Sequence, residues 1–216
     1  MNEANLASIA QSLVADGRGI LAADESTGTI TKRFDGIGVE STEENRRTYR
    51  ELLFTTPGLG DFVSGAILYD ETIRQAAKDG TPIPALLAKQ NIHPGIKVDT
   101  GAKPLTGSPE ETVTEGLDGL RERVAEYHGL GARFAKWRGV IKIDGLIPTP
   151  YCIETNAHAL ARYARLCQDG GLVPIVEPEV LMEQMFRATD LETRVGLNMN
   201  VLDANMVPQV MNLRDV

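Results

Sequence analysis

The amino-acid sequence predicts an α/β fold in which parallel strands alternate with helices, as in a (β/α) barrel. Two observations lead to this class. Short apolar runs alternate along the chain with segments of helical periodicity, and several of these runs end in a charged residue. Such alternation gives right-handed crossovers between parallel strands. In a barrel, charged residues at the strand ends meet at one rim, where function is expected.

Size and composition fit a soluble protein with a buried core. The chain has 216 residues, of which 42% are hydrophobic and 24% are charged. A net charge of −8 without a continuous basic stripe predicts no nucleic-acid partner. The opening residues lack the features of a signal peptide, and no apolar stretch is long enough to span a bilayer. Two cysteines are too few for a disulfide framework, so we expect a cytoplasmic protein without membrane contact.

Local patterns define the elements of the first half. Residues 5–16 have the spacing of an amphipathic helix, and residues 19–23 form an apolar run expected to be a buried strand. Ser41 and Glu44 form a capping box that opens a helix reaching Phe54. The same reasoning predicts, in order, a strand over 62–69, a helix over 71–78 and a strand over 95–99.

The second half continues the alternation. Ser108 followed by Pro109 and Glu111 is typical of a helix start, so we expect a long helix from there to Gly129. The remaining predicted elements are a strand over 132–136, a helix over 151–168 and a strand over 172–176. A doubly wound open sheet is the structural alternative, but no predicted strand runs into the G-x-G-x-x-G loop that it would usually carry.

Lys136 stands out because of its immediate neighbours. It lies in the segment Phe134-Ala-Lys-Trp-Arg138, which contains the only tryptophan of the chain. Apolar surroundings and nearby positive charge both disfavour an ionised amine. A lysine in this setting can be partly neutral near pH 7, which suits a proton shuttle or a nucleophilic amine, although this segment taken alone favours the alternative given next. The alternative is a strand-end lysine whose amine reaches solvent.

Charged or polar residues also mark the ends of the other predicted strands. These residues are Asp24, Tyr69, Lys97 with Asp99, Lys136 with Arg138, and Glu177 with Glu179. We expect their side chains to converge on one rim, where lysines and carboxylates shift one another's pKa values and serve as acid and base partners. The alternative for any one of them is a solvated charge or a structural ion pair.

Five segments, taken together, carry a resemblance to a known family. They are Gly17–Gly28, Thr42–Arg47, Gly95–Asp99, Ala135–Arg138 and Val176–Glu179. They closely resemble segments of class I fructose-bisphosphate aldolase, in that family's order and at about its spacing, over roughly residues 5–182. The resemblance implies a (β/α)8 TIM barrel that reversibly cleaves fructose 1,6-bisphosphate through a lysine Schiff base. This is a retro-aldol step of glycolysis and gluconeogenesis and needs no cofactor.

The resemblance also implies four catalytic residues. Asp24 matches an aspartate that orients the substrate and the intermediate, and Lys136 matches a lysine that assists carbinolamine chemistry. Glu177 matches a glutamate that acts as acid and base. Glu179 matches a neighbouring carboxylate that supports the lysines electrostatically.

Five further residues match positions that bind a sugar phosphate. Ser26, Thr29 and Arg33 fall where the family has residues near a substrate phosphate, although serine is common at the position of Thr29. Lys97 and Arg138 match substrate-binding positions. A bisphosphate needs positive charge at both ends and a proton donor between them, which agrees with these assignments.

A metal-dependent aldolase is the less favoured alternative. The three histidines, His93, His128 and His158, are widely spaced and form no H-x-x-H pair, so we expect no metal site. Each is interpreted as a helix-surface or loop residue. Cys152 and Cys167 share one helical pattern and are expected to face the core as inert thiols.

The sequence departs from the family at the sixth strand. The family has its Schiff-base lysine in a Leu-Lys-Pro-Asn-Met-Val motif, whereas this chain has Leu202-Asp-Ala-Asn-Met-Val207, with Asp203 at the position of the lysine. No lysine follows Lys142. Because a carboxylate cannot form an imine with a ketone, we expect the covalent route to be closed.

These observations predict an incomplete barrel. Residues 1–182 are expected to form an aldolase-like portion with about five or six parallel strands, and residues 183–216 a divergent, Met-rich segment of a truncated or variant aldolase. Open sheet edges predict poor stability or aggregation. Three hypotheses stay open: an aldolase by lineage with impaired activity, a non-catalytic protein that binds phosphorylated ligands or associates with a second copy or a full-length aldolase subunit, and an aggregation-prone product without a function of its own.

Overall fold

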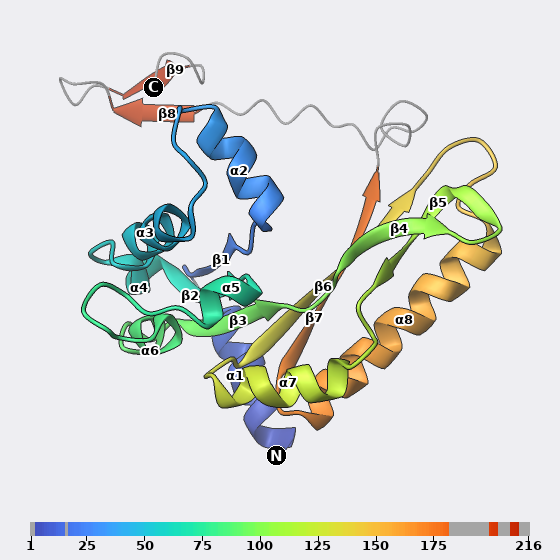
Figure 1. Cartoon of the computed structure of the whole chain (residues 1–216), viewed down its shortest axis with the longest axis horizontal. Coiled ribbons are helices and arrows are strands. Elements are labelled where there is room, and N and C mark those ends of the chain that lie inside the picture. Colours follow the sequence, from blue (N-terminus) through green and yellow to red (C-terminus); the bar gives the residue numbers. More distant parts are fainter. Residues whose placement is uncertain (1–2, 16, 182–198, 203–207, 212–216) are drawn as a thin grey trace. The chain divides into compact units, whose positions relative to one another are not determined.

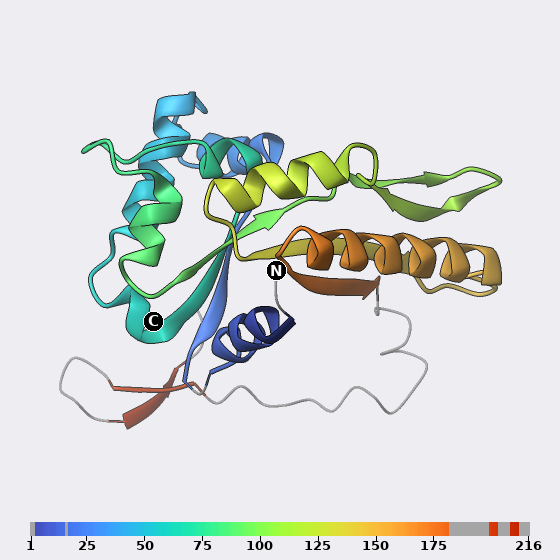
Figure 2. The same ribbon diagram turned by 90° about the horizontal axis from the view of Figure 1, so that it is seen from below.

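The structure is a computed structural model that describes residues 3–15, 17–181, 199–202 and 208–211 of the chain. The chain divides into two units, Met1–Leu181 and Met182–Val216. The first unit contains a parallel sheet with helices packed on its faces (Figures 1 and 2). Most of the second unit lies outside the described residues, so the predicted domain boundary at residue 182 stays a prediction.

The sheet of the first unit has the strand order β1-β2-β3-β6-β7, and each neighbouring pair is parallel. Its strands are β1 (Gly19–Ala23), β2 (Val63–Leu68), β3 (His93–Lys97), β6 (Phe134–Lys142) and β7 (Val173–Leu181). All five predicted strands are therefore confirmed as strands. The prediction that β1 is buried is wrong for most of its length, because β1 is an edge strand in which Ala23 alone is buried.

Helices precede, connect and cover the strands. They are α1 (Glu3–Leu13), α2 (Thr27–Asp35), α3 (Glu43–Phe54), α4 (Leu59–Phe62), α5 (Asp70–Ile73), α6 (Ile83–Ala88), α7 (Leu120–Gly129) and α8 (Pro150–Asp169). Helix α8 lies along β6 and β7 (Figure 1), and α1 lies on the other face of the sheet (Figure 2). The predicted helices over 5–16 and 151–168 are thus confirmed, with small changes in their bounds.

Alternation along the strands separates two packed faces. In β6, Ala135 and Trp137 belong to the main core beneath α7 and α8, whereas Phe134 points the other way and packs against Leu13 of α1. Side chains two residues apart share a face of a strand. Lys136 therefore lies on the same face as Phe134, which we call the inner face.

Two glycines make room for Phe134 on the inner face. A Cβ atom on Gly95 of β3 would lie 2.2 Å from the Phe134 ring, and one on Gly65 of β2 would lie 2.9 Å from it. Contacts this short are sterically forbidden. The bare backbone of two neighbouring strands thus packs against one ring, which fills the inner face on the amino-terminal side of Lys136.

The structure corrects several helix boundaries. The predicted helix over 71–78 is wrong beyond Ile73, where α5 ends, and α2 and α6 were not predicted at all. The predicted capping box is also wrong, because Thr42 is the N-cap of α3. Its side chain accepts a hydrogen bond from the Asn45 backbone N–H.

The predicted helix start at Ser108 is wrong, because this segment forms a β-hairpin. Strands β4 (Gly101–Leu105) and β5 (Ser108–Glu115) pair antiparallel, and α7 begins only at Leu120. The run Thr112-Val-Thr114 is β-branched and favours a strand over a helix. Gly107 supplies the positive φ of 86° at the turn.

The second unit contains β8 (Met199–Leu202) and β9 (Pro208–Met211), which pair antiparallel in a sheet of their own. Of the predicted sixth-strand segment Leu202–Val207, Leu202 is the last residue of β8 and the others lie outside the described residues. In the part of the chain that the structure describes, no helix has both the length and the apolar character needed to cross a membrane.

Candidate functional site

A cavity of about 520 Å³ lies at the carboxyl ends of the parallel strands. Seven of the nine predicted site residues line it, namely Asp24, Ser26, Thr29, Arg33, Lys97, Lys136 and Arg138. Strand β1 ends immediately before Asp24, β3 ends at Lys97, and β6 carries both Lys136 and Arg138. Because the strands are parallel, residues far apart in the sequence meet at this edge of the sheet.

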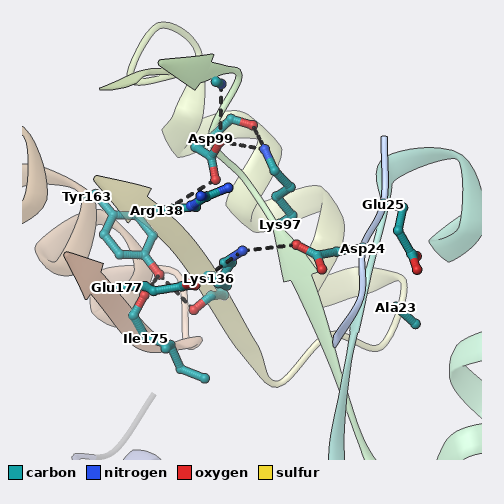
Figure 3. A network of polar contacts seen from close by, with 12 residues as sticks. Ala23, Asp24, Glu25, Lys97, Asp99, Lys136, Arg138, Tyr163, Ile175 and Glu177 are labelled. Atoms are coloured by element: carbon teal, nitrogen blue, oxygen red, sulfur yellow. Dashed lines mark hydrogen bonds and ion pairs between the residues drawn. The ribbon is translucent and has the colours of Figure 1, made fainter. Parts of the chain in front are cut away.

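Lys136 occupies the centre of the charged cluster (Figure 3). Its Nζ atom lies 3.2 Å from Asp24 Oδ2 and 3.2 Å from Glu177 Oε2, and the residue is 8% exposed. Burial lowers the pKa of Lys136, but the Asp24 and Glu177 carboxylates raise it by more, so the pKa lies above its ordinary value of 10.5. The predicted partly neutral amine is therefore wrong. The sequence neighbours of Lys136 are apolar, but its spatial neighbours are two carboxylates.

A second charged group is organised by Asp99, which is 8% exposed. Lys97 Nζ forms an ion pair with the Asp99 carboxylate and donates to the Asp99 carbonyl oxygen at 2.9 Å. The carboxylate also accepts hydrogen bonds from the backbone N–H groups of Gly101, at 3.1 Å, and Arg138, at 3.4 Å. Asp99 thus orients Lys97 and connects β3, β4 and β6 (Figure 3). Its place after a strand was noted in the sequence, but no role was assigned to it.

Arg50 of α3 holds the backbone on both sides of Asp24. It is 2% exposed and donates to the Ala23 carbonyl oxygen, to the Glu25 carboxylate at 2.6 Å and to the Glu25 carbonyl oxygen at 3.0 Å. Burial lowers the pKa of Arg50 and nearby Glu25 raises it, and burial prevails. Sequence analysis missed Arg50 and Glu25, because an arginine in a charged helical segment is usually exposed.

The amino-terminal end of α2 forms one corner of the cavity. Ser26 is the N-cap of this helix and accepts a hydrogen bond from the Thr29 backbone N–H, and the two hydroxyl oxygens lie 3.1 Å apart. Arg33 lies one turn further along the helix and forms an ion pair with Glu25. Backbone N–H groups and the positive end of the helix dipole make such a corner suitable for a phosphate group.

The two predicted glutamates both belong to β7. Glu177 reaches Lys136 from there, and its side chain is 45% exposed. Glu179 lies on the same strand, but the structure does not describe its side chain. The structure thus brings eight of the nine predicted residues into one cluster, and the role of each residue stays a prediction.

The histidines and cysteines lie away from this cluster. His93 begins β3 instead of lying in a loop or on a helix surface, whereas His128 and His158 belong to α7 and α8. Cys152 and Cys167 are both buried in α8, as predicted, and burial raises the pKa of Cys167 to about 12. Among the described residues, no group of three or more potential ligands could hold a metal ion.

Comparison with known proteins decides the family. The model of the glycolytic family fructose-bisphosphate aldolase class-I matches residues 5–207. The chain belongs to the class I fructose-bisphosphate aldolase family. The resemblance noted in the sequence is thereby confirmed.

Relatives of this aldolase-family chain extend well beyond it. It is 66% identical over 183 residues to a probable fructose-bisphosphate aldolase class 1 of Xanthomonas campestris, which covers 85% of the chain and 55% of the relative. It is 57% identical over 180 residues to the fructose-bisphosphate aldolase of Schistosoma mansoni, which covers 83% of the chain and 50% of the relative. The chain thus spans about half the length of the curated relatives that it matches.

A solved structure supports the fold of the family. The Plasmodium falciparum fructose-bisphosphate aldolase, determined in complex with TRAP and a small molecule inhibitor, is 57% identical to the chain, with a TM-score of 0.80. The similarity covers 82% of this chain and 52% of that one. It confirms the predicted fold class, a parallel α/β sheet of the TIM-barrel family.

Proposed function

We propose that the carboxyl-end cavity binds fructose 1,6-bisphosphate, the substrate named for the family. The observation that carries this proposal is the distribution of cations around the cavity. Arg33 lies at the helix corner with Ser26, and Lys97 and Arg138 lie on the strands β3 and β6. A doubly phosphorylated sugar needs donors for a phosphate at each end, and guanidinium and ammonium groups are the usual donors.

In this proposal the central residues act on the carbon skeleton between the phosphates. Lys136 is held in its protonated form by Asp24 and Glu177, so it is a hydrogen-bond donor to an oxygen of the sugar. In the family's retro-aldol reaction, which gives dihydroxyacetone phosphate and glyceraldehyde 3-phosphate, Glu177 would act as acid and base and Asp24 would orient the substrate. Glu179 supports the lysines from the same strand. The setting is cytoplasmic glycolysis and gluconeogenesis.

We further propose that this chain does not cleave the sugar through the family's Schiff base. The match to the family extends to residue 207 and so spans Leu202–Val207, the segment whose sequence pattern would put Asp203 at the position of the lysine. No lysine follows Lys142 in the chain. A carboxylate cannot attack a ketone to give an imine. The chain is then a binding protein for phosphorylated ligands with impaired or absent aldolase activity.

The lysines in the cavity do not replace the missing amine. Lys97 is paired with Asp99, and Lys136 is paired with both Asp24 and Glu177. Only a neutral amine attacks a carbonyl group, and the carboxylates of Asp24 and Glu177 favour the protonated form of Lys136. The raised pKa of Lys136 therefore argues against a nucleophilic role.

Two measurements on the 216-residue chain test the proposal. Fructose 1,6-bisphosphate should raise the thermal unfolding midpoint, since a ligand at a hundredfold excess over its Kd stabilises the folded state by about 2.7 kcal/mol. Borohydride reduction in the presence of the sugar should leave the mass of the chain unchanged. Lys97→Gln should weaken the stabilisation, whereas Lys103→Gln, an exposed lysine of β4, should preserve it.

Two results would contradict these proposals separately. A borohydride-stable adduct on Lys97 or Lys136 would show that an amine of the cavity attacks the sugar, and would overturn the proposed loss of Schiff-base chemistry. Absence of any ligand-induced stabilisation, or equal stabilisation of the Lys97→Gln and Lys103→Gln chains, would overturn the proposed binding site.

We also propose a second candidate function, association with a full-length aldolase subunit or a second copy of this chain. The observation that favours it is that, in the described part of the chain, β1 pairs with β2 alone and β7 pairs with β6 alone. Each outer edge thus presents backbone groups to an incoming strand. Co-purification of the tagged chain with an intact aldolase tests this candidate, and recovery of the tagged chain alone as a monomer would contradict it.

A further inference from the structure

A second cavity, of about 570 Å³, lies at the opposite end of the parallel strands. Arg18 precedes β1, His93 begins β3 and Arg133 precedes β6. From His93, β3 runs to Lys97, so roughly 13 Å of strand separates this cavity from the one described above. We call it the amino-end recess. Its basic side consists of Arg18, His93 and Arg133, and its apolar side of Pro84, Ala85, Ala88, Ile92, Pro94 and Leu130.

The recess is positively charged in an acidic protein. The chain has 30 acidic and 22 basic residues, yet none of the described residues that line the recess carries a carboxylate. Burial lowers the pKa of His93, and the positive charges of Arg18 and Arg133 lower it further. Both guanidinium groups therefore lie near one imidazole. The recess attracts anions.

Anchoring of loops explains part of this arrangement. Arg18 donates to the carbonyl oxygens of Val63, at 2.7 Å, and Asn91, at 2.8 Å. Arg133 donates to the Ala132 carbonyl oxygen at 2.8 Å. A guanidinium group has five N–H donors, so both arginines keep further N–H groups that these bonds do not use. Arg18 Nε is buried and has no hydrogen-bond partner among the described residues.

We propose that the amino-end recess binds a small phosphomonoester with an apolar body. The phosphate lies between Arg18 and Arg133, because guanidinium groups bind phosphate oxygens in a two-pronged geometry. The body lies on the apolar side, along Ala85 and Leu130. The recess has the volume of a typical small-molecule site, and its walls are largely apolar with a few convergent polar groups, as such sites are. This site is distinct from the cavity proposed for fructose 1,6-bisphosphate.

Titration of the 15N-labelled chain with phenyl phosphate, followed by NMR, tests this site. The amides of residues 91–93 and 129–133 should shift on addition of phenyl phosphate, and much less on addition of phenol or inorganic phosphate alone. Ala88→Glu places a carboxylate on the wall of the recess at an exposed helical position. It should raise the Kd by about fivefold or more, because a carboxylate at short range repels the phosphate.

Three further variants, two of them controls, make the test specific. Ala157→Glu makes the same substitution at an exposed position of α8 outside the recess, and its Kd should equal that of the parent chain. Arg133→Gln should weaken binding. Lys97→Gln, at the other end of β3, should leave it unchanged. Equal affinity of the Ala88→Glu and Ala157→Glu chains, or shifts confined to residues 99–102 of the other cavity, would overturn the proposal.

Discussion

At Lys136, burial and charge act on one amine in opposite directions. Burial alone would favour the neutral form, but Asp24 and Glu177 each lie 3.2 Å from Nζ and keep the pKa above 10.5. A raised lysine pKa stabilises the folded protein at every pH below the unfolded value. That contribution is lost only as the pH rises through the still higher folded value. Through neutral pH, Lys136 is therefore a fixed positive charge on the inner face.

The first prediction removes the two carboxylates. In the Asp24→Asn, Glu177→Gln chain, burial acts without opposition, so the pKa of Lys136 should fall below the ordinary value of 10.5. NMR titration of the lysine side chains measures this directly. A Lys136 pKa that does not change would show that its partners lie elsewhere.

The second prediction concerns Arg50, which is buried, unlike Arg47 on the same helix. Arg50→Ala removes three acceptor contacts and leaves Glu25, whose side chain is 10% exposed, without its buried partner. Breaking a buried pair from one side costs about 3 kcal/mol or more of unfolding free energy. Arg50→Lys should cost less but still measurably, because an ammonium group cannot span acceptors on both sides of Asp24.

Arg47 provides the matched control for Arg50 on the same helix. It pairs with Glu44 and Glu51 at the helix surface, where solvent screens an ion pair and its contribution to stability is small. Urea unfolding of the Arg50→Ala and Arg47→Ala chains should therefore give clearly different midpoints. Equal midpoints would mean that the Arg50 contacts contribute no more than surface ion pairs do.

At the scale of elements, Glu111 connects the β4–β5 hairpin to the start of α8. It is 1% exposed and accepts hydrogen bonds from Ser108 Oγ at 2.7 Å, from the Thr149 backbone N–H at 2.7 Å and from Thr149 Oγ1 at 2.6 Å. Thr149 is in turn the N-cap of α8. Burial raises the pKa of Glu111, but the bonds from Thr149 and Ser108 lower it by more, to about 2 from 4.5.

The third prediction follows from the sign of that shift. A lowered carboxyl pKa stabilises the folded state above the unfolded value, and the contribution is lost as the pH falls from 4.5 toward about 2. The parent chain should therefore lose more unfolding free energy over this range than the Glu111→Gln chain does. Urea unfolding at neutral and acidic pH measures the difference. Glu110→Gln, at the exposed neighbouring position, should behave like the parent chain.

The same hairpin shows where sequence patterns mislead about elements. Ser108 and Glu111 have the spacing of a helix start, and their side chains do form a hydrogen bond, but at the beginning of a strand. The spacing of Ser108 and Glu111 is compatible with a helix start and with a strand. The contact that favours the strand is the hydrogen bond of Glu111 with Thr149, 38 residues away along the chain. Helix α6 has only six residues, and α2 has only two buried apolar residues, Ile30 and Phe34, so neither was recognised as a helix in the sequence.

The strands and most of the candidate site were predictable for a different physical reason. Parallel strands place their carboxyl ends at one edge, so Asp24, Lys97 and Lys136 had to meet once the alternation was recognised. What the sequence does not contain is the identity of neighbours across the sheet. The sign of the Lys136 pKa shift depends on Asp24 and Glu177, which lie 112 and 41 positions away along the chain. The roles of Asp99 and Arg50 depend on their hydrogen bonds with backbone groups, which no pattern of side chains reveals.

At the scale of the whole molecule, we expect the open edges of the sheet to determine whether the chain self-associates in solution. In the described part of the chain, β1 and β7 each have a single neighbouring strand. Apolar side chains near these edges are exposed, with Ile20 of β1 at 37% and Val176 of β7 at 45%. An unprotected edge with exposed apolar side chains is a site at which other strands pair.

The fourth prediction is that self-association of the chain depends on the β7 edge. Val176→Lys places a charge on this strand, a substitution that opposes edge-to-edge pairing, and should lower the associated fraction measured by sedimentation velocity at increasing concentration. Leu146→Lys makes the same kind of change in a loop, at a side chain that is 96% exposed, without touching an edge. If pairing at the edge drives association, Val176→Lys reduces it and Leu146→Lys does not. An equal reduction by both variants would instead assign the association to exposed apolar surface in general, and the unpaired strand would lose its special role.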